Sequence, residues 1–132
     1  MNIAEARAAT TVLIVDDEPQ NAKLLSRILS SAGYGQVHAT HDSSRVVDIV
    51  ARERPDLLLL DLAMPAPDGF ALLELLQDRL NDEPPLRAVL LTGHEHPSIA
   101  AKGRELGARD VVSKALKRDA LVARLDAVLT SA

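Results

Sequence analysis

The chain reads LLLLD at residues 57–61 and continues with LAMPAPDG at residues 62–69. Four consecutive leucines without polar alternation, preceded by Pro55 and followed by a loop with proline and glycine, predict a strand buried on both faces. Asp61 therefore stands at the rim of the predicted sheet. Ligands of open α/β sheets bind beyond the carboxyl ends of the strands. Asp61 is thus a candidate functional residue; taken alone, it could equally cap the following loop.

The composition restricts the function classes. The chain has 132 residues, 19 acidic and 15 basic residues, a formal charge of −4 and no cysteine. This length suits one domain, and the lack of cysteine excludes disulfides and cysteine-based zinc sites. The negative charge, with Tyr34 and Phe70 as the only aromatic residues, argues against direct nucleic-acid binding. Without a membrane-spanning stretch or a signal peptide, we expect a cytoplasmic protein.

Four further segments have the character of strands. They are residues 11–15, 36–40, 86–91 and 110–113. The most apolar segments, which are the first, third and fourth of the five in chain order, predict central strands. The second and fifth segments are shorter or more polar and predict the two edges of the sheet.

The helical spacing of apolar residues predicts five helices. They cover approximately residues 19–32, 42–54, 70–80, 97–106 and 118–129. Pro19 suits the first turn of the first helix, and Gly33 suits its end. Gly103 weakens the fourth helix by up to ~1 kcal/mol relative to alanine, so we expect that helix to be comparatively mobile. Residues 1–10 are expected to form a flexible lead-in to a domain of residues 11–130.

Strands and helices alternate five times along the chain. Short connections between them favour parallel strands with right-handed crossovers. The predicted fold class is therefore α/β, a doubly wound five-stranded parallel sheet in the flavodoxin-like order 2-1-3-4-5 with five helices. The strand order reverses between the first and third strands, so we expect the site at their carboxyl ends.

Polar side chains follow four of these strands at the same rim. They are Asp16 and Asp17, Asp61, Thr92 and Lys114. Three neighbouring carboxylates repel one another unless a cation offsets their charge, and such oxygen ligands suit Mg²⁺. An aspartate can act as a nucleophile toward phosphorus. Because phosphoryl transfer depends mainly on positioning and charge neutralisation, a metal ion, a lysine and a hydroxyl group form a sufficient set.

From about Thr11 to Leu129 the chain resembles the receiver domain of two-component response regulators. The resemblance rests on four stretches in the right order at the strand ends. They are VLIVDDE at residues 12–18, DLAMPAPDG at 61–69, LTG at 91–93 and GARDVVSK at 107–114.

The resemblance implies a phosphorelay function. Asp61 would accept a phosphoryl group from the phosphohistidine of a sensor histidine kinase or phosphotransfer protein, or from a small phosphodonor. Mg²⁺ would be bound by Asp17, Asp61 and the backbone carbonyl of Ala63, and by Asp16 largely through water. The added negative charge would then bias the loop and helix near residues 92–106.

The resemblance also assigns the remaining site residues, with two departures from the family pattern. Lys114 would pair with the phosphoryl oxygens, and Thr92 would move inward to donate its hydroxyl to them. Val111 stands where receivers usually have tyrosine or phenylalanine, so the usual coupled movement of a ring cannot occur. Ala115 stands where proline usually follows the lysine. Since a cis bond without proline costs ~2.5–4 kcal/mol, we predict a trans Lys114–Ala115 bond and a rearranged loop.

The sequence thus predicts a signalling module rather than an enzyme with a diffusible substrate. Its surface for a homodimer or a downstream protein would be the face formed by residues 97–129, whose mixed charges are otherwise typical of solvated surface. One alternative is a non-phosphorylated pseudo-receiver that acts in protein interaction or dimerisation. A second is a Mg²⁺-dependent phosphatase of the haloacid dehalogenase type. That class has an Asp-x-Asp pair after its first strand, whereas Glu18 stands two residues after Asp16 here.

Overall fold

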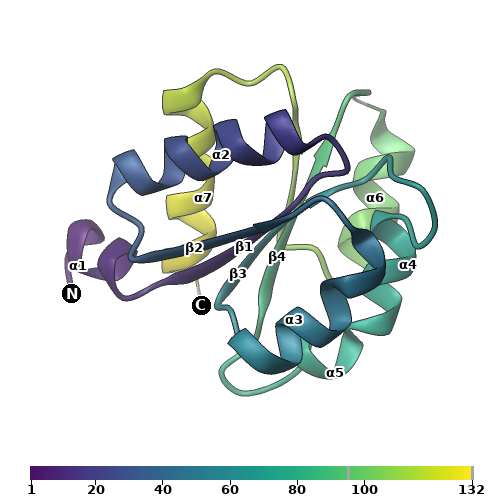
Figure 1. Cartoon of the computed structure of the whole chain (residues 1–132), viewed down its shortest axis with the longest axis horizontal. Coiled ribbons are helices and arrows are strands. Elements are labelled where there is room, and N and C mark those ends of the chain that lie inside the picture. The colour runs from purple at the N-terminus through teal and green to yellow at the C-terminus, as the bar shows by residue number, and fades with distance from the viewer. Residues whose placement is uncertain (95, 132) are drawn as a thin grey trace.

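The computed structural model describes residues 1–94 and 96–131. Five parallel strands form one sheet in the order β2-β1-β3-β4-β5, with helices on both faces (Figure 1). The strands are β1 (Thr11–Val15), β2 (Gln36–Thr40), β3 (Leu57–Asp61), β4 (Arg87–Thr92) and β5 (Asp110–Ser113). The helices are α1 (Ile3–Ala8), α2 (Pro19–Ala32), the 3₁₀ turn η1 (Ser43–Arg45), α3 (Val46–Glu53), α4 (Gly69–Leu75), α5 (Gln77–Leu80), α6 (Pro97–Glu105) and α7 (Arg118–Thr130).

The leucine run of β3 lies at the centre of the sheet, and all four of its leucine side chains are fully buried. Leu57 and Leu59 belong to the core between the sheet and helices α2 and α7. Leu58 and Leu60 belong to the core on the opposite face, below α3, α4 and α5. A strand that is covered on both faces needs this uninterrupted apolar sequence. The predicted fold class and strand order are therefore confirmed.

The helices differ from the predicted five. Seven α-helices lie within the described residues, because α1 adds one and the expected helix of residues 70–80 is split into α4 and α5 at Leu76. The side-chain amide of Gln77 donates to the carbonyl oxygens of Leu73, at 3.0 Å, and Leu106. This side-chain bond occupies a carbonyl that a continuous helix would use for its backbone hydrogen bond. The start of the second predicted helix forms the short turn η1 instead.

The first ten residues, expected as a lead-in, contain helix α1. The Arg7 guanidinium forms an ion pair with both carboxylate oxygens of Asp126 on α7 and donates to the carbonyl of Ala32 at 3.1 Å. Tyr34 also donates its hydroxyl to Asp126, at 2.9 Å. These contacts attach α1 to the C-terminal parts of α2 and α7. The mobility of residues 1–10 stays a prediction.

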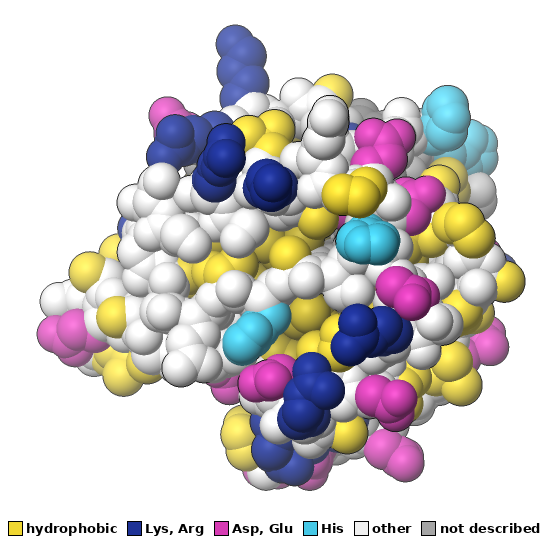
Figure 2. Space-filling view, in the orientation of Figure 1, with side chains coloured by type: hydrophobic (Ala, Val, Ile, Leu, Met, Phe, Trp, Pro, Cys, Tyr) yellow, Lys and Arg dark blue, Asp and Glu magenta, His cyan; other side chains and the backbone are white. Residues whose placement is uncertain are grey.

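The strand β2 forms an open edge of the sheet. Figure 2 shows hydrophobic side chains in the hollows that flank this strand, with acidic, basic and histidine side chains interspersed over the same face. None of the helices in the described part of the chain is long and apolar enough to cross a membrane.

Candidate functional site

Three carboxylates meet where β1 and β3 end. The two strands pair in parallel with Val15 opposite Leu60, so the residues that follow, Asp16 and Asp61, lie side by side. Each is only 1% exposed. Asp17 is more exposed and completes a group whose potential ligand oxygens all lie within 4.8 Å of one another. The structure therefore brings together the three aspartates that the sequence singled out.

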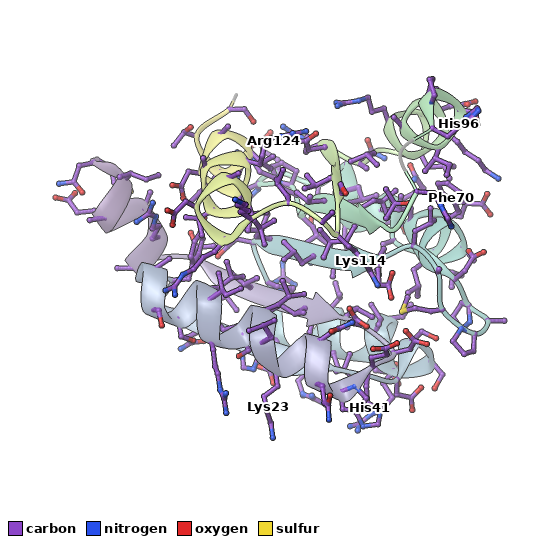
Figure 3. The ribbon with its side chains drawn as sticks, turned by 90° about the horizontal axis from the view of Figure 1, so that it is seen from above. Lys23, His41, Phe70, His96, Lys114 and Arg124 are labelled. Atoms are coloured by element: carbon purple, nitrogen blue, oxygen red, sulfur yellow. The ribbon has the colours of Figure 1, made fainter. Side chains whose placement is uncertain are left out.

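Lys114 provides the cation of this group from the end of β5 (Figure 3). Its Nζ lies 2.9 Å from Asp61 Oδ2 and 3.7 Å from Asp16 Oδ2. Burial acts most strongly on the pKa of Lys114 and lowers it, but the contact with Asp61 and the charges of Asp16 and Asp17 outweigh burial and raise that pKa overall. Lys114 is therefore a fixed positive charge beside the acidic cluster.

The negative charge of the Asp61 carboxylate is only partly balanced by neighbouring groups. Burial is the main cause that raises its pKa; Lys114 opposes this effect, and the charge of Asp16 adds to it. Oδ1 accepts a hydrogen bond from the Ala63 amide at 3.3 Å. Oδ2 lies 2.9 Å from the Lys114 ammonium, and no other donor among the described residues bonds to it.

The donor set fits a magnesium ion. Three carboxylates next to a single ammonium group leave excess negative charge, and hard carboxylate oxygens are the ligands that Mg²⁺ prefers. Oδ2 of Asp61, whose one partner among the described residues is Lys114, adds a buried acceptor to this set. Ala63 lies next to Asp61, but a metal contact of its carbonyl oxygen stays a prediction.

The loop after β3 turns back sharply onto the end of that strand. Gly69 donates its amide to the carbonyl of Leu62 at 3.1 Å. A Cβ atom at this position would lie 2.9 Å from both the Asp61 carbonyl oxygen and Leu62 Cα, so only glycine fits without displacing backbone. The glycine of the DG pair therefore fixes the start of α4 against the backbone of Asp61.

Thr92 ends β4 at the same rim and is 6% exposed. Its hydroxyl donates to the carbonyl oxygen of His94 at 2.9 Å and accepts the amide of His94 at 3.1 Å. The amide of Lys114 donates to the backbone carbonyl of Thr92 at 2.8 Å, which ties the two strand ends together. The Thr92 side chain is thus bonded to its own loop rather than to Asp61.

The two positions that depart from the family pattern lie beyond the acidic cluster. Val111 is half-buried and packs against the core below α4 and α5. A cavity of about 290 Å³ lies beside it, lined by the apolar side chains of Ile99 and Ala100 and by Thr92. The Lys114–Ala115 bond is trans, as predicted, and the chain turns here through a hydrogen bond from the Ala115 amide to Ser113 Oγ at 3.1 Å.

The sequence did not indicate an ion network at the start of β5, the end of that strand away from Lys114. Asp110 on β5 accepts two hydrogen bonds from Arg124 on α7 at 2.7 Å and one from Arg104 on α6 at 3.2 Å. Burial acts most strongly on the pKa of Asp110 and raises it, but Arg124, the Val111 amide and Arg104 together lower it overall. The one sequence signal for this network is the charged Asp110 at the start of a short, otherwise largely apolar strand.

A hollow of about 160 Å³ lies beside the acidic cluster, between α2 and the loop before α7. Asp16 and Lys114 form its inner end, and apolar side chains such as Leu25 and Leu116 line the rest. The hollow therefore joins the charged site to an apolar surface.

The family model for the response regulator receiver domain matches residues 12–126. The chain belongs to this family. It is 36% identical over 118 residues to the response regulator MprA of Mycobacterium avium, covering 89% of this chain and 50% of that protein. The chain thus spans about half the length of the curated relatives it matches.

Solved receiver structures agree with this assignment. The BeF3-activated N-terminal receiver domain of Klebsiella pneumoniae RstA superimposes with a TM-score of 0.82 at 29% identity, covering 92% of this chain and 99% of that one. The signal receiver domain of a signal transduction histidine kinase from Syntrophus aciditrophicus has a TM-score of 0.79 at 31% identity, covering 92% and 91%. The resemblance drawn from the four sequence stretches is therefore confirmed.

Proposed function

We propose that this receiver domain accepts a phosphoryl group on Asp61 and acts as a phosphorylation-controlled switch. The observation that carries the proposal is the buried Asp61 carboxylate, with Lys114 Nζ at 2.9 Å and the oxygens of Asp16 and Asp17 within 4.8 Å. A nucleophile, a fixed cation and a set of metal ligands are the parts that phosphoryl transfer requires.

The proposed step is a transfer from a phosphohistidine or a small phosphodonor. An Asp61 carboxylate oxygen attacks phosphorus, the new oxygen–phosphorus bond forms, and the bond to the imidazole nitrogen breaks. The imidazole leaves with the electron pair of that bond and takes a proton from water; with acetyl phosphate as the small phosphodonor, the oxygen–phosphorus bond of that donor would break instead and acetate would leave with the electron pair. Lys114 lies close enough to Asp61 to neutralise part of the phosphoryl charge.

Magnesium, when bound, would supply the remaining charge neutralisation. We propose that Asp16, Asp17, Asp61 and the carbonyl of Ala63 hold this ion, with Asp16 acting largely through water. The excess negative charge of the cluster supports this proposal.

The proposed phosphodonor is a sensor histidine kinase or a phosphotransfer protein. The hollow beside Asp16 and Lys114 supports an approach along α2, because it leads from an apolar surface to the charged site. Output would pass through the face of residues 97–129, toward a second copy or a downstream protein. A cytoplasmic location and the absence of turnover on a diffusible substrate stay predictions.

The proposed switch is an exchange of hydrogen bonds by Thr92. Its hydroxyl would give up both bonds to the His94 backbone and donate to a phosphoryl oxygen on Asp61 instead. Because the loop after β4 leads directly into α6, this exchange would move the start of that helix.

Intact-mass spectrometry tests the acceptor chemistry. We expect the wild-type domain, incubated with acetyl phosphate and Mg²⁺, to gain the mass of one phosphoryl group, and to gain none with EDTA. Asp61→Asn should show no gain. Asp68→Asn is the matched control, since Asp68 lies in the same loop but caps α4 through the Ala71 amide.

Two results would contradict the proposal. A folded domain that neither gains a phosphoryl group nor binds beryllofluoride would favour the pseudo-receiver. Steady hydrolysis of a phosphate ester would favour the phosphatase.

A further inference from the structure

Helix α6 is held to the rest of the domain by few buried contacts. Of its nine residues only Gly103 is buried. A Cβ atom on Gly103 would lie 2.7 Å from Leu90 Cδ1 and 3.0 Å from Val111 Cγ2, so the helix backbone rests directly on these side chains. Elements with few buried apolar contacts are the ones that shift at low cost. Any additional contact to α6 therefore has a large share in setting its position.

One such contact joins α6 to α4. The Nζ atom of Lys102 lies 4.6 Å from the centroid of the Phe70 ring, which is within the range of a cation–π interaction. Phe70 packs against the core as the second residue of α4, and Figure 3 shows it at the junction of α4 and α6. Lys102 is exposed and forms no salt bridge within residues 1–94 and 96–131. The ring is therefore its one attachment to another helix there.

The ring is also connected to the acceptor strand. Phe70 directly follows Gly69, whose backbone packs on the carbonyl oxygen of Asp61 and on Leu62. A backbone displacement at Asp61 would therefore reach the Phe70 ring through a single tightly packed residue, Gly69. The Lys102 ammonium, at the other end, moves with α6.

Building on the proposed function, we propose that Phe70 and Lys102 form a brake on switching. Their contact holds α6 in the arrangement in which the Thr92 hydroxyl is bonded to His94, and it is lost when α6 moves on phosphorylation of Asp61. Phe70 and Lys102 are thus positioning residues that act on Thr92 through α6. A cation–π contact at an exposed site corresponds to about a two- to fivefold change in an equilibrium constant.

A double-mutant cycle on beryllofluoride binding tests the brake. Phe70→Leu keeps an apolar side chain and removes the ring, and Lys102→Met keeps the stem and removes the charge. The dissociation constant of beryllofluoride with Mg²⁺ is measured by calorimetry for the wild type, both single variants and the double variant. We expect each single variant to bind about two- to fivefold more tightly, and the double variant to bind no more tightly than the single ones.

Urea unfolding without beryllofluoride shows whether the two residues are coupled in the resting domain, and the dissociation constant then separates a brake from a purely structural contact. A contact present in both states would couple the two residues in unfolding and leave the dissociation constant unchanged, and this result would overturn the proposal. Weaker binding by either single variant would overturn it as well. If the wild-type domain itself binds no beryllofluoride, that result would instead refute the proposed phosphoacceptor function.

Conservative and remote variants complete the design. Lys102→Arg and Phe70→Tyr retain the cation and the ring, so both should bind beryllofluoride like the wild type. Lys23→Met removes one positive charge from α2, where Lys23 points away from the site (Figure 3). It should leave the dissociation constant unchanged, and a tighter constant here would mean that net charge, not the ring contact, governs binding.

Discussion

Replacing Asp61 by asparagine should stabilise the domain when divalent cations are absent. The Asp61 side chain is buried, and the oxygens of Asp16 and Asp17 lie within 4.8 Å of it. Burial first, and then the charge of Asp16, raise the pKa of Asp61, although Lys114 acts against them. A raised carboxyl pKa means that folding disfavours the charged form. An uncharged side chain of the same shape removes that cost.

The distances give the size of the effect. At an effective dielectric constant of about 20, two unit charges 4.8 Å apart repel by about 3.5 kcal/mol, so Asp16 costs Asp61 about this much and the more exposed Asp17 costs it less, because water screens its charge. Lys114 at 2.9 Å returns about 6 kcal/mol. The attraction to Lys114 and the repulsion from the two aspartates thus largely cancel, and the removal of the Asp61 charge from water remains as the main cost. We expect Asp61→Asn to raise the free energy of unfolding by about 1–3 kcal/mol.

Urea unfolding at pH 7 in EDTA measures this gain, with Asp126→Asn as the matched control. Burial acts most strongly on the pKa of Asp126 and raises it, but the hydrogen bonds from Arg7 and Tyr34 together lower it overall. Replacing Asp126 by asparagine should therefore have the opposite effect and lower the free energy of unfolding by about 1–3 kcal/mol. Mg²⁺ should stabilise the wild type more than Asp61→Asn, because binding to the folded state alone adds stability.

The pH dependence gives a second check of the signs. The unfolded pKa of an aspartate is about 4. Because the folded pKa of Asp61 is raised, its cost develops as the pH rises from that value through the folded pKa, so the gain of Asp61→Asn should vanish in acid. Because the folded pKa of Asp126 is lowered, its stabilisation is complete above about pH 4 and is lost as the pH falls through the folded pKa. Equal or lower stability of Asp61→Asn in EDTA at pH 7 would refute the reasoning.

Three further substitutions test other parts of the fold and site. Lys114→Met leaves the acidic cluster without its cation, so urea unfolding in EDTA should show a loss of about 3 kcal/mol, partly restored by Mg²⁺. Gly35→Ala would place a Cβ atom 2.0 Å from the carbonyl oxygen of Ala8 and must displace α1. Its cost should be about 1–3 kcal/mol, and unchanged stability would show that α1 is not docked there. Thr92→Val removes two hydrogen bonds to His94. Mass spectrometry should still detect phosphoryl acceptance, while the changes that beryllofluoride causes in the NMR signals of α6 should disappear.

The central sheet and the acidic cluster were predictable because they depend on local pattern and on one topological rule. Uninterrupted apolar runs such as residues 57–60 indicate strands that are covered on both faces. Once the strands are parallel, the residues that follow them must meet at one rim. Asp16, Asp61 and Lys114 could therefore be grouped from the sequence although they are far apart in it.

The remaining features depend on contacts that leave no periodic signal. Arg7 and Asp126 are 119 residues apart, and nothing local to either residue indicates the partner. At the break between α4 and α5, the side-chain amide of Gln77 reaches two carbonyl groups, and one of them belongs to Leu106, 29 residues away. The hydroxyl orientation of Thr92 was equally hidden, because a threonine at a strand end can bond to its own loop or to a ligand.

The departure at Val111 bears on the route of signal output rather than on the acceptor chemistry. The chain has only two aromatic residues, Tyr34 and Phe70. Tyr34 donates its hydroxyl to Asp126 on α7, at the end of the domain where α1 docks. Phe70 contacts Lys102 on α6, and it follows the glycine packed on Asp61. In the proposed brake, coupling through an aromatic ring would therefore run from the loop after β3 across α4, and not from β5.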